Sequence, residues 1–169
     1  MLMKTEISAS NLVDSIVMLG SQLYDRRLWL ATAESCTGGG VGQVLTSVAG
    51  SSRWYRGGVI AYCNQLKQQL LGVDEAILLQ HGAVSQAVVE TMAVNTCSHC
   101  NADLAVSTSG VAGPDGESFD KPVGLVWLAW AYRGRVTSRV FHFSGGRHAI
   151  RTMAGIAVVS GLLDLLVDR

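Results

Sequence analysis

Apolar residues recur at helical spacing near the start of the chain, at Leu12, Ile16, Leu19 and Leu23. This period predicts an amphipathic helix that begins at a serine cap around residues 8–10 and ends near residue 26. Short apolar runs bounded by glycine or polar residues are typical of strands. The same reasoning predicts further helices over 38–48, 64–71, 75–80, 85–96 and 144–167, and strands over 28–34, 57–62, 103–109, 125–132 and 136–143. The expected N-caps are Asn64, Asp74, Ser85 and Ser144, and the expected helix stops are Gly72 and Gly82.

Helices and strands alternate in the first half of this pattern, and two strands around Arg133-Gly134 form a hairpin late in the chain. That order predicts an α/β protein with a mixed β-sheet covered by helices on both faces. The chain has 169 residues, of which 49% are hydrophobic and 15% are charged, so we expect a single domain over 1–169. Both prolines lie in the polar segment 110–124, and a loop of that length is usually functional or mobile.

Charge and cysteine content exclude several classes of protein. Thirteen basic residues balance thirteen acidic ones, so no net field attracts nucleic acid or an anionic membrane. The apolar stretch 152–163 is too short to span a bilayer, and the N-terminus lacks a secretory signal, which favours the cytoplasm. Cys97 and Cys100 have redox or zinc spacing, but no second ligand pair is close, so we expect packed thiols and no metal or redox site there.

The segment Ala33-Glu34-Ser35-Cys36-Thr37-Gly38-Gly39-Gly40 combines a hydroxyl, a thiol and three glycines directly after an apolar strand. A glycine-rich helix start leaves backbone N–H groups that can hold an anion or an oxyanion. Ser35 is therefore a candidate nucleophile, with the N–H groups of Cys36, Thr37, Gly38 and Gly39 as oxyanion donors. The alternative is a tight strand-to-helix turn without chemistry.

Lysine is scarce, and Lys67 lies in the first turn of the helix that Asn64 is expected to cap. The positive end of the helix dipole there favours a neutral amine, which can act as a base. The alternative is a solvated lysine on a short amphipathic helix. Tyr62, at the end of the preceding strand, either carries a proton or packs its ring. The Ser-x-x-Lys pattern at 118–121 lies in a loop and is interpreted as a chance match.

Arg147 and Arg151 are four residues apart at the start of the last helix, after two glycines. Both guanidinium groups then share one helix face, where a phosphate or carboxylate would offset their unfavourable position at the positive end of the helix. Two exposed arginines are the alternative.

Several segments together resemble one family, the CinA C-terminal domain family, whose stand-alone members include nicotinamide mononucleotide deamidases. The resemblance covers about residues 10–165 and rests on Ala33–Gly39, Ala49–Ser52, Gly57–Tyr62 with Asn64 and Lys67, Leu71–Val73, His81–Ser85, Gly110–Gly116, Lys121–Gly124, and Arg147 with Ile150-Arg151. It implies hydrolysis of nicotinamide mononucleotide to nicotinate mononucleotide and ammonia without a cofactor. It also implies a homodimer.

The resemblance assigns Ser35 as nucleophile, Lys67 as general base and Tyr62 as an assisting hydroxyl. It implies that substrate or phosphate is bound by Arg147, Arg151, Asn64, Ser109 and Gly110. The chain departs from the common family pattern at Cys63, Ser109 and Gly146, which keeps open a non-catalytic nucleotide-binding or regulatory module. A hydrolase that uses the Cys36 thiol is a second alternative.

Overall fold

The structure is a computed structural model that describes residues 7–115 and 121–167. Within these residues the helices are α1 (Leu12–Asp25), α2 (Gly40–Leu45), the short 3-10 helix η1 (Ser51–Arg53), α3 (Asn64–Leu71), α4 (Glu75–His81), α5 (Gln86–His99) and α6 (Arg147–Val167). The strands are β1 (Leu30–Glu34), β2 (Tyr55–Ile60), β3 (Leu104–Gly110), β4 (Leu125–Tyr132) and β5 (Arg135–His142).

The five strands form one mixed sheet in the order β2-β1-β3-β4-β5. The strands β2, β1 and β3 are parallel, whereas β4 and β5 join antiparallel through the expected hairpin. Arg133 and Gly134 both have positive φ angles, 50° and 73°, which suits the tight turn between two twisted strands. The predicted mixed α/β sheet is confirmed.

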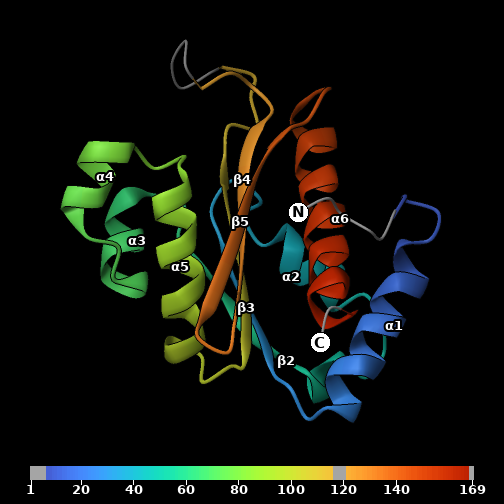
Figure 1. Ribbon diagram of the computed structural model, residues 1–169. Helices are drawn as coiled ribbons and strands as arrows, with labels where there is room; N and C mark the ends of the chain where they lie inside the picture. The colour runs from blue at the N-terminus through green and yellow to red at the C-terminus, as the bar shows by residue number, and fades with distance from the viewer. Residues whose placement is uncertain (1–6, 116–120, 168–169) are drawn as a thin grey trace.

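Helices cover both faces of the sheet, with α3, α4 and α5 on one side and α1, α2 and α6 on the other (Figure 1). The larger core lies under α1, α2 and α6 and includes Leu19, Leu30, Leu128 and Leu162. A second core lies under α3, α4 and α5 around Met92. β1 is buried along its whole length because it has a strand on each edge and helices on each face.

Element boundaries shift where caps differ from the expected ones. Asn64 is the first residue of α3 and Cys63 is its N-cap, so the prediction of an Asn64 cap is wrong. The last helix begins at Arg147 rather than directly after Ser144. The caps predicted at Asp74 and Ser85 are confirmed, because their side chains accept hydrogen bonds from the N–H groups of Ala76 and Val88.

The helix α6 extends beyond the apolar stretch 152–163 at both ends. It has 21 residues and is long and apolar enough to span a membrane by length and composition alone. Of its most apolar window, 61% is buried against the rest of the protein. Its apolar side chains are therefore used in the core against β4, α1 and α2.

The carboxyl ends of β1, β2 and β3 meet at one edge of the sheet. Three segments leave the sheet there: 35–39 after β1, 61–63 after β2 and 111–115 after β3. Ligands of open α/β sheets bind at this kind of edge, so the fold brings the predicted site residues into one region.

Candidate active site

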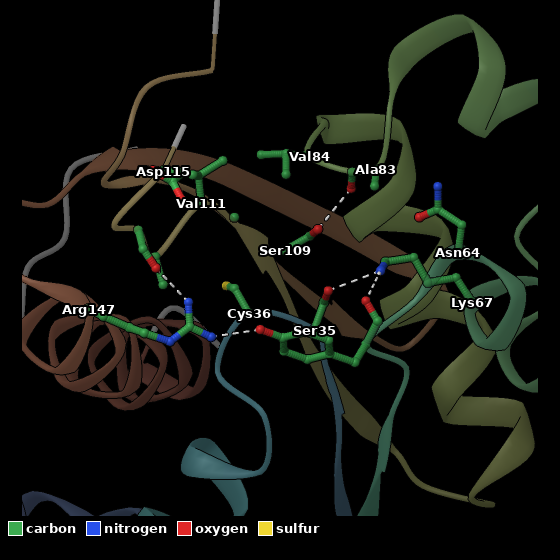
Figure 2. Close-up of a pocket in the computed structure, with 14 residues that line it drawn as sticks. Ser35, Cys36, Asn64, Lys67, Ala83, Val84, Ser109, Val111, Asp115 and Arg147 are labelled. Carbon is green, nitrogen blue, oxygen red and sulfur yellow. Dashed lines mark hydrogen bonds between the residues drawn. The ribbon is translucent and has the colours of Figure 1, made fainter. Parts of the chain in front are cut away.

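A cavity of about 300 Å³ opens at this edge of the sheet. Its size is at the lower end of the range for small-molecule sites. It is lined by Ser35, Cys36, Tyr62, Asn64, Lys67, Ala83, Val84, Ser109, Gly110, Val111, Ala112, Gly113, Asp115 and Arg147 (Figure 2). Most of the residues singled out in the sequence thus line one cavity.

Ser35 and Lys67 point toward one another across this cavity (Figure 2). The Lys67 Nζ atom donates a hydrogen bond to Ser35 Oγ over 3.0 Å. It also donates to the main-chain oxygens of Ala61 and Tyr62, over 3.1 and 3.2 Å. A nucleophile and a base within direct hydrogen-bond reach satisfy the first geometric requirement for activating a hydroxyl.

Lys67 is among the most completely buried side chains of the protein, with 1% of its surface exposed. A solvated lysine on an amphipathic helix, the alternative from the sequence, is therefore wrong. Helical side chains lean toward the N-terminus of their helix, and from the first turn of α3 this direction brings Nζ back to residues 61 and 62.

The turn after β1 directs its N–H groups to acceptors within the protein. Gly38 N donates to Ser35 O over 3.0 Å, and Gly39 N donates to Glu34 Oε2 over 2.9 Å. This corrects the expectation that Gly38 and Gly39 supply oxyanion donors, because both groups already have acceptors. The N–H groups of Cys36 and Thr37 have no acceptor on another described residue, and Cys36 lines the cavity.

Glu34 is a buried acidic residue beside the site that the sequence did not single out as a candidate. Its carboxylate is buried and accepts hydrogen bonds from Thr37 Oγ1 and from the N–H groups of Gly39, Val41 and Gly42. An acidic residue directly before a glycine-rich helix start was the available signal, since a carboxylate is stabilised at a helix N-terminus.

The Cys36 thiol is buried beside Ser35, and desolvation raises its pKa to about 11. A thiol must ionise to become a strong nucleophile, so Cys36 stays protonated and weakly reactive at neutral pH. This disfavours the alternative of a cysteine hydrolase.

Arg147 connects two walls of the cavity. Its Nη1 donates to the main-chain oxygen of Gly113 and its Nη2 donates to the Tyr62 hydroxyl, both over 2.7 Å. Tyr62 is 54% exposed, and within the described residues its hydroxyl makes no hydrogen bond to Ser35 or Lys67. The contact between Tyr62 and Lys67 runs through the Tyr62 main-chain oxygen instead.

Arg151 does not line the cavity. Its guanidinium donates to the Thr37 main-chain oxygen through Nε and Nη2, over 3.2 and 2.7 Å. The structure therefore separates the two arginines that were expected to hold one phosphate together. Arg147 faces the cavity, and Arg151 holds the turn that carries Ser35.

The remaining expected binding residues, Asn64, Ser109 and Gly110, all line the cavity. Ser109 Oγ donates to the main-chain oxygen of Ala83 over 2.8 Å and so joins the end of β3 to the segment before α5. The other two departures from the family pattern, Cys63 and Gly146, do not line the cavity. These two departures therefore give less reason to expect a non-catalytic nucleotide-binding module.

Other candidates lie away from the site. Among the described residues no group of three or more His, Cys, Asp or Glu side chains could hold a metal ion. Cys97 and Cys100 are free thiols, and Cys97 packs against the core of Val89, Ala93 and Ala129. Of the Ser-x-x-Lys pattern, residues 118–120 lie outside the described part of the chain, and Lys121 donates to His81 O over 3.4 Å.

Fold and site together define an α/β protein with a buried Ser–Lys pair in a cavity at the carboxyl edge of its parallel strands. Residues 14–166 match the family described as "CinA C-terminal domain". The chain belongs to the CinA C-terminal domain family.

Relatives in sequence cover nearly the whole chain. A protein of Escherichia coli (strain K12) named "Nicotinamide-nucleotide amidohydrolase PncC" is 49% identical over 86% of this chain and 88% of its own length. A protein of the same name from Pseudomonas putida is 48% identical over 87% of this chain and 92% of its own length. A solved competence-damaged protein (CinA) superfamily protein from Klebsiella pneumoniae is 32% identical, with a TM-score of 0.91 over 94% of this chain and 99% of its own.

Proposed function

We propose that the protein is a nicotinamide-nucleotide amidohydrolase, which hydrolyses the carboxamide of nicotinamide mononucleotide to give nicotinate mononucleotide and ammonia in pyridine nucleotide recycling. The single observation that carries the proposal is the buried contact of 3.0 Å between Lys67 Nζ and Ser35 Oγ. Its substrate is suggested by the names of the relatives that are 45–49% identical. The cytoplasmic location, expected from the sequence, and the homodimer, implied by the family resemblance, both stay predictions.

Lys67 is the proposed general base. The main-chain oxygens of Ala61 and Tyr62 can only accept hydrogen bonds, so they orient two N–H bonds of the amine. In a neutral amine the lone pair then faces the Ser35 hydroxyl, and removal from water favours that neutral form. The hydrogen bond between Ser35 and Lys67 reverses its direction in this state, and the hydroxyl becomes the donor.

The reaction proceeds through an acyl-enzyme. Ser35 Oγ attacks the carboxamide carbon while Lys67 takes the hydroxyl proton, and the carbonyl oxygen becomes an oxyanion. Lys67 returns the proton to the leaving nitrogen, the C–N bond breaks, and ammonia departs. Water then attacks the ester with Lys67 as base, and the proton passes to Ser35 Oγ as nicotinate mononucleotide is released.

The Cys36 N–H group is the proposed oxyanion donor, with the Thr37 N–H beside it. Cys36 lines the cavity next to Ser35, and neither N–H has an acceptor on another described residue. Donors fixed in advance near the developing charge supply a large part of the acceleration in acyl transfer.

The two ends of the substrate suit different parts of the cavity. Ala83, Val84, Val111 and Ala112 offer apolar surface for a pyridine ring near Ser35. Arg147 lies on the other side of Ser35 from Lys67 and offers a guanidinium to the phosphate (Figure 2). The Tyr62 hydroxyl, which accepts a hydrogen bond from Arg147, would then assist by holding that guanidinium.

The direct test is ammonia release from nicotinamide mononucleotide by the wild type, Ser35→Ala and Lys67→Met. We expect release by the wild type and a loss of at least about 100-fold in each variant. Ser98→Ala, an exposed serine on α5, is the matched control and keeps full activity. Binding of the nucleotide by the wild type without ammonia release would contradict the proposal, as would equal rates in all variants.

A further inference from the structure

The Glu34 carboxylate is buried directly before the proposed nucleophile, with 2% of the residue exposed. Its Oε2 atom accepts from Thr37 Oγ1 over 2.7 Å, from Gly39 N over 2.9 Å and from Val41 N over 3.0 Å. Its Oε1 atom accepts from Gly42 N over 2.8 Å. Burying a carboxylate costs free energy unless it is hydrogen-bonded, so its position calls for a function. The proposed mechanism gives this side chain no chemical step.

These contacts decide which N–H groups of the turn remain available. The carboxylate takes the donors at the start of α2, while Ser35 O and Thr37 O accept from Gly38 N and Gly40 N. What remains along this turn is the pair at Cys36 and Thr37, directly beside Ser35. A negative charge already fills the N-terminus of α2, so a substrate phosphate is directed away from it.

The same carboxylate fixes the turn against β3. Thr37 Oγ1, which donates to Glu34, also shares a hydrogen bond of 2.8 Å with Thr108 Oγ1. Ser35 N donates to Thr108 O over 3.0 Å. The nucleophile is thus held between Glu34 on one side and the end of β3 on the other.

We propose that Glu34 is a positioning residue for acyl transfer, which fixes the turn that carries Ser35 Oγ and the Cys36 N–H so that the hydroxyl stays in line with Lys67. The inference rests on the proposed function for its reaction. Beyond the nucleophile and the base, the reaction then depends on a third side chain, because the Glu34 carboxylate fixes the geometry of the turn. A displacement of about 1 Å at a reacting group lowers a rate by roughly 100-fold.

The test compares Glu34→Ala, Glu34→Gln and wild type in kcat and KM for ammonia release. Glu34→Ala removes every acceptor, so kcat falls by roughly 100-fold while KM changes by less than about 3-fold. In Glu34→Gln the amide oxygen can take the position of Oε2 and keep three contacts, while the amide NH2 group faces the Gly42 N–H and cannot accept from it, so kcat falls by less than about 10-fold. Glu90→Gln is the matched control, because Glu90 accepts hydrogen bonds from Gln86 and Ser138 on α5 and β5, away from the cavity.

A second measurement separates this inference from the choice of substrate. The rate at which a fluorophosphonate labels Ser35 reports the reactivity of the hydroxyl without nicotinamide mononucleotide, and we expect the same order: wild type, Glu34→Gln, Glu34→Ala. Labelling in this order without ammonia release by the wild type would contradict the proposed substrate and leave the role of Glu34 supported. Unchanged kcat and labelling in folded Glu34→Ala would overturn the inference, as would absence of labelling in the wild type.

Folding is controlled by thermal unfolding of each variant. If Glu34→Ala does not fold, Thr37→Val replaces it, because this change removes the hydroxyl that joins Glu34 to Thr108. We expect roughly a 10-fold lower kcat and a similar KM for Thr37→Val. Wild-type kcat in folded Thr37→Val would then contradict the positioning role.

Discussion

Arg151 donates two hydrogen bonds to the main-chain oxygen of Thr37, a residue 114 positions earlier in the chain. The contact joins the N-terminal part of α6 to the turn that carries Ser35. Arg151 therefore contacts the backbone of the turn that carries the proposed nucleophile and does not line the cavity that would hold substrate.

Replacing Arg151 by alanine should lower stability and kcat together. Hydrogen bonds from a charged donor contribute about 1.5–3 kcal/mol, so we expect a loss of that size in the free energy of unfolding. The mobile turn then lowers kcat, and KM changes little. Denaturant unfolding and steady-state kinetics measure both effects, with Arg135→Ala, an exposed arginine at the far end of β4 and β5, as the control. A large rise in KM without loss of stability would instead support the phosphate contact expected from the sequence.

Replacing Arg147 by alanine should raise KM, in contrast to the loss of kcat and stability expected for Arg151→Ala. A guanidinium that binds phosphate contributes to KM, and its loss raises KM for nicotinamide mononucleotide by roughly 10- to 100-fold. Nicotinamide riboside has no phosphate, so its kcat/KM should change little in the same variant. The ratio of the two kcat/KM values is the measurement. An equal loss for nucleotide and riboside would show that Arg147 acts through Tyr62 and Gly113 rather than on phosphate.

The site shows what sequence reasoning reaches and where it stops. Ser35 and Lys67 could be named as candidates because local chemistry singled out both, a hydroxyl at a glycine-rich helix start and an amine in a first helical turn, and the structure brings them into contact. Their roles as nucleophile and base stay predictions. The acceptors of the N–H groups in this turn could not be predicted. A glycine-rich helix start does not reveal that the Glu34 carboxylate, one residue before Ser35, accepts from these N–H groups. Arg151 illustrates the same limit, since helical spacing gives the face of a side chain but not its partner.

The fold, too, was predictable from the sequence only in part. Periodicity gave the order and type of the main helices and strands, and the long-range register of the mixed sheet needed the structure. Predicted helix boundaries were wrong where the backbone geometry of single residues decides them. The helix expected over 38–48 is observed from Gly40 to Leu45. Its late start follows from Gly38 and Gly39, whose positive φ angles of 57° and 93° cannot begin a right-handed helix.

The Cys36 thiol gives the protein a pH dependence that a substitution isolates. Its pKa is raised from an ordinary value of 9.0 to about 11, so the folded state holds the proton more tightly than the unfolded chain. Below pH 9 both states are protonated and this effect on stability is constant; from about pH 9 to about pH 11 the unfolded chain ionises first and stability falls.

Thermal or denaturant unfolding of wild type and Cys36→Ala across this range checks the effect. The wild type should lose roughly 2–3 kcal/mol more than Cys36→Ala between pH 8 and pH 11. Tyr55, Cys97 and Cys100 also have raised pKa values, but both proteins share them, so subtracting the two stability curves removes their contribution. Parallel curves would contradict a buried, protonated thiol. The activity of Cys36→Ala at neutral pH should survive, whereas complete loss would revive the thiol as nucleophile.

Two glycines of α6 form a matched pair that tests how closely this helix packs on the sheet. A Cβ atom at Gly161 would overlap the indole ring of Trp130 on β4, whereas a Cβ at Gly155 would meet only Val44 at an ordinary distance of 3.7 Å. Alanine is favoured over glycine in a helix by about 1 kcal/mol, so Gly155→Ala should be neutral or stabilise the protein by up to that amount.

Gly161→Ala should destabilise instead, by about 1–3 kcal/mol, because the added methyl group forces the Trp130 ring out of its position. That ring is buried, and its Nε1 donates to Val158 O over 3.2 Å, so a shift also costs a hydrogen bond inside the core. Denaturant unfolding and the fluorescence of the indole report the two consequences. Equal stabilisation by both substitutions would mean that α6 lies farther from β4 than the structure places it.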